Sequence, residues 1–246
     1  MIGDIDWIFL SNSYWLDDQV PCLTYGLRGV IHASVEISST RPDTHSGVEG
    51  GSIREPMMDL ITLLACLTDK GKIVLDGFYD DVRKLTPGEE KLYEAITKKW
   101  FRPPSPPKEN YINRVSHLEP ETLMARWRLP SLTIHKIVTS GSSHGSVIPH
   151  KARAVLSMRI VPDQTLSQII ATFKSTLQEK FDSLQSDNSL SVVVEHKADW
   201  WLGDPENRGF KALEKAVREE WGVKPLYIRE VTSLSLSFVS VVWDDD

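Results

Sequence analysis

The sequence is poor in cysteine, with only Cys22 and Cys66 among its 246 residues. Each stands in an apolar surrounding without a CxxC spacing, which argues against a disulfide framework and against a structural zinc knuckle. Long hydrophobic runs are also missing, and the opening stretch MIGDIDWIFL is too short and too acidic for a signal peptide. We therefore expect two buried thiols in a cytoplasmic protein.

Basic residues are outnumbered, with 28 Lys and Arg against 34 Asp and Glu, which gives a formal net charge of -6 at pH 7. No face or tail concentrates lysine and arginine, so the electrostatic footprint of a nucleic-acid-binding protein is missing. We expect neither a nucleic-acid partner nor a membrane partner. The chain is long and apolar enough, with 41% hydrophobic residues, to bury at least one sizeable core.

Two common catalytic signatures are not indicated by the sequence. No GxSxG nucleophile elbow is expected, because the stretch SGSSHGS from Ser140 to Ser146, which holds this spacing, is too rich in glycine and serine for a strand-to-helix elbow. The seven histidines stand alone, without an HExxH motif or an HxD pair. These absences disfavour a serine hydrolase, and the residues by themselves supply no complete metal site.

The centre of the chain alternates between strand-like and helix-like patterns. Period-two alternation of apolar residues predicts half-buried strands. Helical periodicity predicts one helix after the glycine-rich loop, from about Met57 to Leu67, and a second from Thr165 to Phe181. The four predicted strands are Val30–Ile37, Ser131–His135, Arg153–Ile160 and Leu190–Val194.

The order of these elements predicts an α+β fold. From Val30 to Glu195 the chain reads strand, helix, strand, strand, helix, strand, which is the split β-α-β arrangement of a ferredoxin-like sheet. Ser52 and Glu55 have the form of a capping box for the first helix, with a start at Pro56 as the alternative. Thr165 opens the second helix in the capping-box manner.

The flanks and one insertion differ from this pattern. Thr86 and the residues after it predict a capped helix that runs to Trp100, and the proline-rich stretch RPPSPPK must then leave the helix as a loop. Ile5–Leu10 resembles a strand buried on both faces, and Phe210–Trp221 predicts a helix before the strand-like LYIRE. These pieces indicate an inserted domain whose host domain is only partly present.

Several polar residues stand at the ends of predicted loops and strands, and each could equally make a local turn hydrogen bond. Arg159 is different, because it lies within an apolar alternation where a charge needs a carboxylate partner or a ligand. A fork-shaped donor there can hold the carboxylate of a peptide. The full set of candidates is Asn12, His45, Ser46, His144, Ser146, His150 and Arg159.

Five successive motifs resemble signatures of the carnosinase-type dipeptidase branch of the co-catalytic zinc peptidases, the superfamily of aminoacylase and acetylornithine deacetylase. They are SYWLDDQVPCLTYGLRG, DTHSGVEGG, MARWRLPSLTIH, SVIPHKARAVLSMRIVP and LYIRE. More narrowly, LSNSYWLDD followed by CLTYGLRGV is similar to the peptidase-like subunits of fungal glutathione-degradation complexes, which work with a glutamine-amidotransferase-like partner. The resemblance covers nearly the whole chain up to Glu230.

The resemblance implies a domain plan and three site residues. Residues 1–28 and 196–230 would be parts of a catalytic domain, residues 29–195 an inserted ferredoxin-like lid that mediates homodimerisation, and residues 231–246 a tail outside the family pattern. It further implies that His45 reaches across the dimer to stabilise the oxyanion in the other subunit. Ser146 would lie near the peptide substrate, and Arg159 would grip its carboxylate.

The departures from the family pattern concern the metal site. Asn12 stands where the family has an aspartate ligand, and an amide is a far poorer zinc ligand than a carboxylate. The other upstream ligands and the general base would precede this chain. We therefore expect a fragment of a zinc-dependent dipeptidase-type hydrolase that has neither bound zinc nor activity alone.

Two other functions fit part of the sequence. The first is a non-catalytic dimerisation and scaffold module of a glutathione-degrading amidase complex. The second is an unrelated ferredoxin-like ligand-binding domain, which accounts for the order of strands but leaves the five motifs unexplained.

Overall fold

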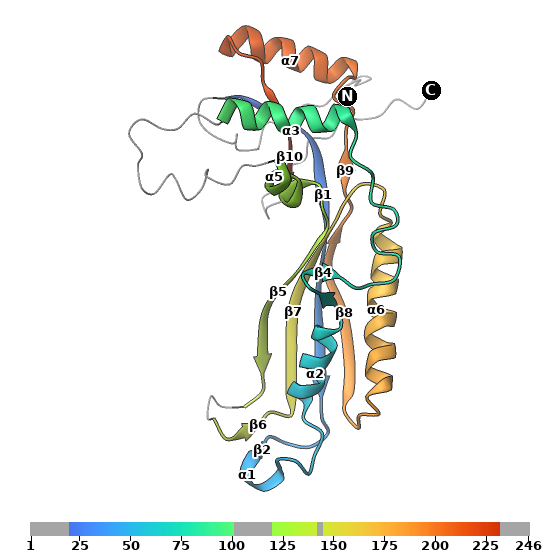
Figure 1. Cartoon of the computed structure of the whole chain (residues 1–246). Coiled ribbons are helices and arrows are strands. Elements are labelled where there is room, and N and C mark those ends of the chain that lie inside the picture. The colour runs from blue at the N-terminus through green and yellow to red at the C-terminus, as the bar shows by residue number, and fades with distance from the viewer. Residues whose placement is uncertain (1–19, 101–119, 142–144, 232–246) are drawn as a thin grey trace, which may run out of the picture. The chain divides into compact units, whose positions relative to one another are not determined.

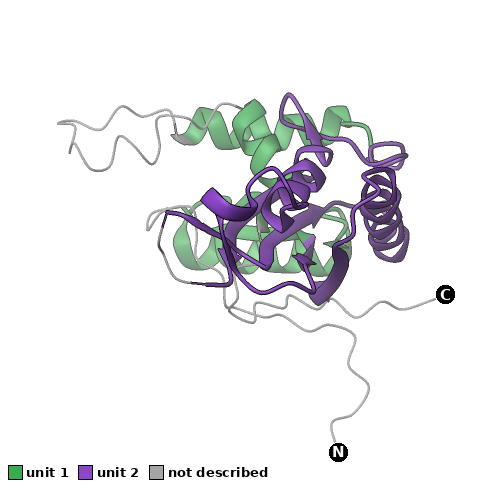
Figure 2. Ribbon diagram, turned by 90° about the horizontal axis from the view of Figure 1, so that it is seen from below, with its two compact units in different colours: residues 1–28, 83–129, 200–246 green, residues 29–82, 130–199 purple. Residues whose placement is uncertain are grey.

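The computed structural model describes residues 20–100, 120–141 and 145–231, and they fall into two compact units (Figures 1 and 2). The central unit comprises residues 29–82 and 130–199. The flanking unit comprises residues 1–28, 83–129 and 200–246. Residues 83–129, which the family resemblance places within the lid, cluster with the flanking segments. The strand and loop predictions at Ile5–Leu10 and RPPSPPK lie outside the described residues.

An antiparallel sheet of four strands forms the core of the central unit, in the order β8-β1-β7-β5 (Figure 1). Numbered along the chain, this order is 4-1-3-2, as expected for the ferredoxin-like arrangement, so the predicted α+β fold is confirmed. The sheet is bulged between His32 and Ala33, and between Ile134 and Lys136. The strands are β1 (Cys22–Ser38), of which residues 29–38 belong to this unit, β5 (Ser131–Thr139), β7 (Lys151–Ile160) and β8 (Ser189–Ala198).

Two helices, α2 (Pro56–Ala65) and α6 (Leu166–Ser183), pack on one face of this sheet. α2 contacts β7, α6 contacts β8, and the two helices contact each other. The alternate residues of β1 that face them, Ile31, Ala33, Val35 and Ile37, are fully buried. Burial of each large side chain of this kind contributes about 1.5–3 kcal/mol, so this face holds most of the core.

Helix α2 begins at Pro56, with Glu55 as its N-cap and no side-chain capping hydrogen bond. The alternative start at Pro56 is therefore confirmed, and the capping box of Ser52 with Glu55 is wrong. The Ser52 hydroxyl instead donates to the carbonyl of Glu49 at 2.7 Å. The capping box at the start of α6 is also wrong, because the Thr165 side chain makes no capping bond.

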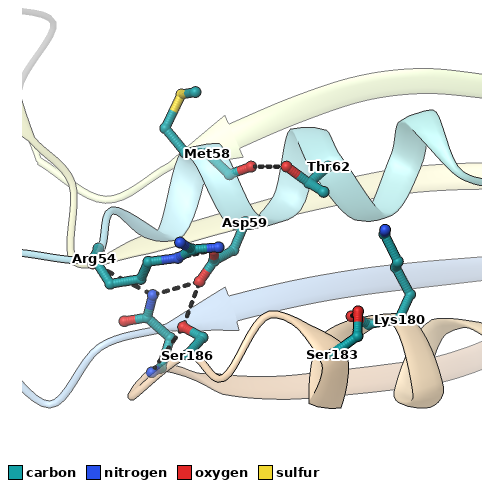
Figure 3. A network of polar contacts seen from close by, with 8 residues as sticks. Arg54, Met58, Asp59, Thr62, Lys180, Ser183 and Ser186 are labelled. Carbon is teal, nitrogen blue, oxygen red and sulfur yellow. Dashed lines mark hydrogen bonds and ion pairs between the residues drawn. The ribbon is translucent and has the colours of Figure 1, made fainter.

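A buried carboxylate joins the start of α2 to the loop between α6 and β8 (Figure 3). Asp59 is fully buried and accepts hydrogen bonds from Arg54 Nε at 2.6 Å and from the Ser186 hydroxyl at 2.5 Å. It also accepts one from Asn188 Nδ2 at 2.8 Å. A buried charge needs such partners, so these bonds hold the two segments together.

The flanking unit has its own small sheet, in which residues 22–28 of β1 pair in parallel with β10 (Leu226–Val231) and antiparallel with β9 (Trp201–Leu202). The predicted strand at LYIRE is thereby confirmed. Helices α3 (Pro87–Trp100), α5 (Pro120–Trp127) and α7 (Arg208–Trp221) accompany it, and all but α5 were predicted. The Glu89 amide donates to the Thr86 hydroxyl at 3.2 Å, which confirms the predicted cap of α3.

Apolar clusters and one buried charge network hold the flanking unit together. Glu89 bonds Arg128 Nε at 3.2 Å and pairs with an Arg229 NH group at 2.9 Å, with all three side chains less than 9% exposed. The Arg229 guanidinium also lies 5.2 Å from the centre of the Tyr25 ring, within the range of a cation–π contact. One apolar cluster comprises Cys22, Tyr93, Ile96, Leu123, Trp127, Leu226 and Ile228, and another Leu23, Tyr25, Phe210 and Tyr227.

The remaining elements are short. A hairpin of β3 (Thr68–Asp69) and β4 (Lys72–Ile73) follows α2, and β2 (Thr44–His45), α1 (Ser46–Glu49) and β6 (Val147–Ile148) form a separate small structure. Both cysteines are free. Cys22 is buried as expected, whereas Cys66 is only partly buried. None of the helices in the described part of the chain combines the length and the apolar character that a membrane span requires.

Candidate functional site

His45 lies at the end of β2 and serves as the N-cap of α1. Its Nδ1 accepts a hydrogen bond from the backbone N–H of Gly47 at 3.0 Å, and the side chain is otherwise exposed. In a neutral imidazole one ring nitrogen accepts and the other donates, so this bond places the proton on Nε2. His45 therefore presents an N–H donor to the exterior, which is the group that an oxyanion stabiliser needs.

The glycines after His45 allow this turn. A Cβ on Gly47 would lie 3.1 Å from two atoms of the His45 ring, closer than most real contacts. Gly51 has a φ of 81°, a conformation that side-chain-bearing residues seldom adopt. The glycines next to His45 therefore allow the tight turn that holds its imidazole in position.

Ser146 lies beside this histidine. Strand β2 pairs antiparallel with β6, so that His45 stands opposite Val147, the residue after Ser146. The backbone N–H of Ser46 donates to the carbonyl of Ser146 at 2.8 Å, and both serines are exposed. The structure therefore brings His45 and Ser146, which are 101 positions apart in the chain, to one surface.

Asp43 anchors this surface to the sheet. Its Oδ1 accepts hydrogen bonds from the Ser140 hydroxyl at 2.8 Å and from the backbone N–H of His150 at 2.7 Å. The Nδ1 of His150 lies 2.7 Å from the same oxygen. These bonds from His150 and Ser140 lower the pKa of the Asp43 carboxyl. We call Asp43, Ser140 and His150 the clasp.

The clasp also requires Gly141. This residue has a φ of 84°, and a Cβ on it would lie 2.5 Å from Asp43 Oδ2. Sequence reasoning missed Asp43, although it lies two residues before His45 in the same motif. His150 was a candidate, and the structure assigns it to the clasp.

Arg159 lies in the four-stranded sheet of the central unit, at the end of β7 that is far from the clasp. It stands opposite Val30 of β1 and Ser131 of β5, and alternates with Met158 and Ile160, which are fully buried under the helices. Its side chain therefore projects from the face without helices. Partial burial lowers the pKa of its guanidinium.

His45 and Arg159 are far apart within one chain. Strand β7 begins at Lys151, beside the clasp, and its rise of about 3.3 Å per residue puts Arg159 roughly 26 Å further along. Figure 1 shows β2, α1 and β6 at one end of β7. The two predicted site residues therefore do not converge in a single chain.

The described residues do not fit a zinc centre. Within residues 20–100, 120–141 and 145–231, no group of three or more histidine, cysteine, aspartate or glutamate side chains converges as metal ligands would. Asn12, the residue aligned with a family ligand, and His144 lie outside the described residues.

A cavity of about 980 Å³ lies in the flanking unit, lined by residues of α3, α7 and β10. Several of its charged groups pair with one another. Glu214 Oε1 lies 3.3 Å from Lys224 Nζ and also receives, at its other oxygen, the Tyr227 hydroxyl at 2.7 Å. Lys211 pairs with Glu206 at 2.8 Å. These two ion pairs neutralise four of the charged side chains that line the cavity.

Comparison with known proteins places the chain in a family. Residues 25–184 match the model of the peptidase dimerisation domain of M20 peptidases. The chain is 36% identical over 233 residues to the probable di- and tripeptidase DUG2 of Saccharomyces cerevisiae, an alignment that covers 94% of this chain and 25% of that protein. It is 35% identical to the Cys-Gly metallodipeptidase DUG1 of the same yeast, over 95% of this chain and 49% of that protein.

Solved structures agree with this relationship. The di-peptidase Dug1p from Saccharomyces cerevisiae superposes with a TM-score of 0.74 at 35% identity, covering 89% of this chain and 46% of that one. Human carnosine dipeptidase 1 gives the same TM-score at 33% identity, with 92% and 48% covered. The chain belongs to the M20 peptidase family and carries its dimerisation domain. It spans a quarter to a half of the length of these relatives.

Proposed function

We propose that this chain is the dimerisation lid, with adjoining parts of the catalytic domain, of a zinc-dependent M20 dipeptidase-type hydrolase, and that alone it is inactive. Two observations support the proposal. Its relatives are named as di- and tripeptidases and metallodipeptidases, while the chain spans at most half of their length. The described residues also hold no converging set of metal ligands.

The observation that carries the proposal is the separation of His45 from Arg159 along β7. A donor for the developing oxyanion and a fork for the substrate carboxylate must act on one small peptide, yet Arg159 lies roughly 26 Å along β7 from Lys151, the residue beside the clasp that holds the His45 loop. Two copies of the lid solve this problem if His45 and Ser146 of one copy face the Arg159 end of the other. His45 would then donate from Nε2 to the oxyanion, and Arg159 would hold the carboxylate through two parallel N–H bonds.

The surface for such a dimer is β5 together with α2. Ile134 and Ile137 of β5 stand opposite Leu156 and Ala154, on the side of the sheet that the helices cover, yet they are 40% and 43% exposed. The edge strand β5 therefore extends beyond the helical layer. Met58 and Ile61 on α2 are exposed as well. An apolar edge strand of this kind is suited to pairing with a second copy.

A non-catalytic role is the second candidate. The match of residues 25–184 to the peptidase dimerisation domain supports a dimerisation and scaffold module. Its partner would be the glutamine-amidotransferase-like subunit of a glutathione-degrading complex. We propose a cytoplasmic location for either role.

The zinc content of the purified chain tests the first proposal. After zinc loading and removal of free metal, elemental mass spectrometry should find far less than one zinc per chain, and Cys-Gly should not be hydrolysed. The complete Saccharomyces cerevisiae DUG1 protein, treated in parallel, is the positive control. Near-stoichiometric zinc with chelator-sensitive hydrolysis would contradict the proposed inactivity.

A further inference from the structure

The cavity of the flanking unit has the size and the walls of a site for a small molecule. Its volume of about 980 Å³ is near the upper end of the range of about 300–1,000 Å³ that such sites have. All the residues that line it belong to the flanking unit. Its apolar and aromatic walls include Tyr25, Leu92, Leu202, Leu226 and Tyr227. We call this space the flanking cavity.

Charged residues line both ends of the flanking cavity. Glu89 and Lys99 lie near opposite ends of α3, roughly 15 Å apart along the helix axis. The Lys99 ammonium donates to the carbonyl of Lys224 at 3.1 Å, and Lys224 pairs in turn with Glu214. Arg229 pairs with Glu89 at the other end. The two ends therefore carry separate sets of charges.

Positive charge is in excess at the Glu89 end. The guanidiniums of Arg128 and Arg229 share the carboxylate of Glu89, and all three side chains are less than 9% exposed. Two positive charges and one negative charge give this buried group a net charge of +1. Gly88, in the first turn of α3, also lines the cavity, so the positive end of the helix dipole lies there too. Because a buried charge is costly without a partner, a second anion at this end would be stabilised.

Arg229 keeps a donor for such an anion. Among the described residues its Nε has no hydrogen-bond partner, although the side chain is only 7% exposed and another of its nitrogens bonds Glu89. The guanidinium lies 5.2 Å from the centre of the Tyr25 ring, so a cation and an aromatic wall adjoin each other. A carboxylate fits the planar fork of a guanidinium, and an apolar body fits the wall beside it.

We propose that the flanking cavity binds a small organic acid with an apolar or aromatic body. The carboxylate lies at the Arg229 end, where it balances the buried positive charge, and the body packs against Tyr25, Leu92 and Tyr227. This site lies wholly in the flanking unit, so it goes beyond the proposed peptidase role and depends on neither zinc nor turnover. The chain can therefore be tested as it is.

The experiment is isothermal titration calorimetry of the full chain at neutral pH with phenylbutyrate, with the neutral phenylbutanamide and with butyrate. Phenylbutyrate should bind. The amide lacks the charge and butyrate lacks the aromatic body, so each should bind roughly tenfold more weakly or less tightly still. In NMR spectra the Nε–H resonance of Arg229 should shift on addition of phenylbutyrate and stay in place on addition of the amide.

Three variants locate the ligand. Ala95→Trp places an indole in the cavity from α3 and should abolish binding. Glu90→Trp, at an exposed position of the same helix outside the cavity lining, is the matched control and should leave binding intact. Arg229→Lys keeps the charge beside Glu89 but loses the planar fork, and should weaken binding about tenfold. Ala95→Trp leaves the buried charges untouched, so it keeps the test decisive if Arg229→Lys fails to fold.

Three results would overturn the proposal. Phenylbutyrate does not bind, or one of its two analogues binds equally well, which would remove either the charge or the aromatic body from recognition. The third is unchanged binding in folded Ala95→Trp protein, which would place the ligand on another surface. Zinc uptake and Cys-Gly hydrolysis have no bearing on these results, so the proposed inactivity and the flanking cavity fail or stand separately.

Discussion

The Nδ1 of His150 lies 2.7 Å from Oδ1 of Asp43, and this contact ties the loop that carries His45 to the start of β7. The same oxygen receives the backbone N–H of His150 and the hydroxyl of Ser140. Through three donors on one carboxylate oxygen, the clasp connects the His45 surface to the sheet. Its disruption should release the surface without unfolding the lid.

Replacing Asp43 by alanine should therefore mobilise the loop. We expect faster hydrogen–deuterium exchange at residues 43–50 and 145–150, because the acceptor of three hydrogen bonds is lost, while residues 151–160 of β7 keep their protection. Asp69→Ala removes an exposed carboxylate of the same unit and is the matched control. Unchanged exchange in the loop of the Asp43→Ala protein would show that the clasp does not hold it.

The clasp should also weaken in acid. The pKa of Asp43 is lowered from its ordinary value of 3.8, so its stabilising effect is complete above that pH and is lost as the pH falls through the lowered value. The difference in urea midpoint between the natural chain and Asp43→Ala should be constant near pH 6 and shrink below about pH 4. A difference that grows in acid would contradict this sign.

Asp59→Ala should destabilise the central unit by about 2–3 kcal/mol, because it leaves the donors of Ser186 and Asn188 without their buried acceptor. The measurement is the free energy of unfolding in urea. Asp187→Ala, which removes an exposed carboxylate from the same loop, should change this free energy by less than about 0.5 kcal/mol. Equal losses in the two variants would contradict the assignment.

A charge on the β5 edge should prevent self-association. Ile137→Lys places an ammonium on the apolar side of the edge strand, where pairing with a second copy would bury it at high cost. Light scattering should then give the monomer mass, whereas the unmodified chain should give the dimer mass. Val193→Lys introduces the same residue on β8, the opposite edge, where Val193 faces the helix-free side and is 49% exposed, and it should leave the dimer intact. The reverse outcome would place the interface on β8.

Local patterns were sufficient for the four long strands and the two long helices of the central unit. The alternation of Ile31, Ala33, Val35 and Ile37 predicted a half-buried strand because the period of two is a property of consecutive residues, and all four are buried. The length of β1 was underestimated, since residues 22–28 pair in a second unit that the alternation does not reveal. The two wrong capping boxes have a similar cause, because a serine or threonine hydroxyl has several local acceptors to choose from.

The sequence by itself determined the α+β class, the order of strands and helices, and the family motifs around His45, Ser146 and Arg159. Only the tertiary structure decided that His45 and Ser146 share a surface, that Asp43 anchors it, and that Arg159 lies at the other end of β7. It also decided that Asp59 is buried among partners 127 and 129 positions away. The periodicity of a sequence shows which side of a strand is buried. The partner of a polar side chain depends instead on the register between strands that are distant in the sequence.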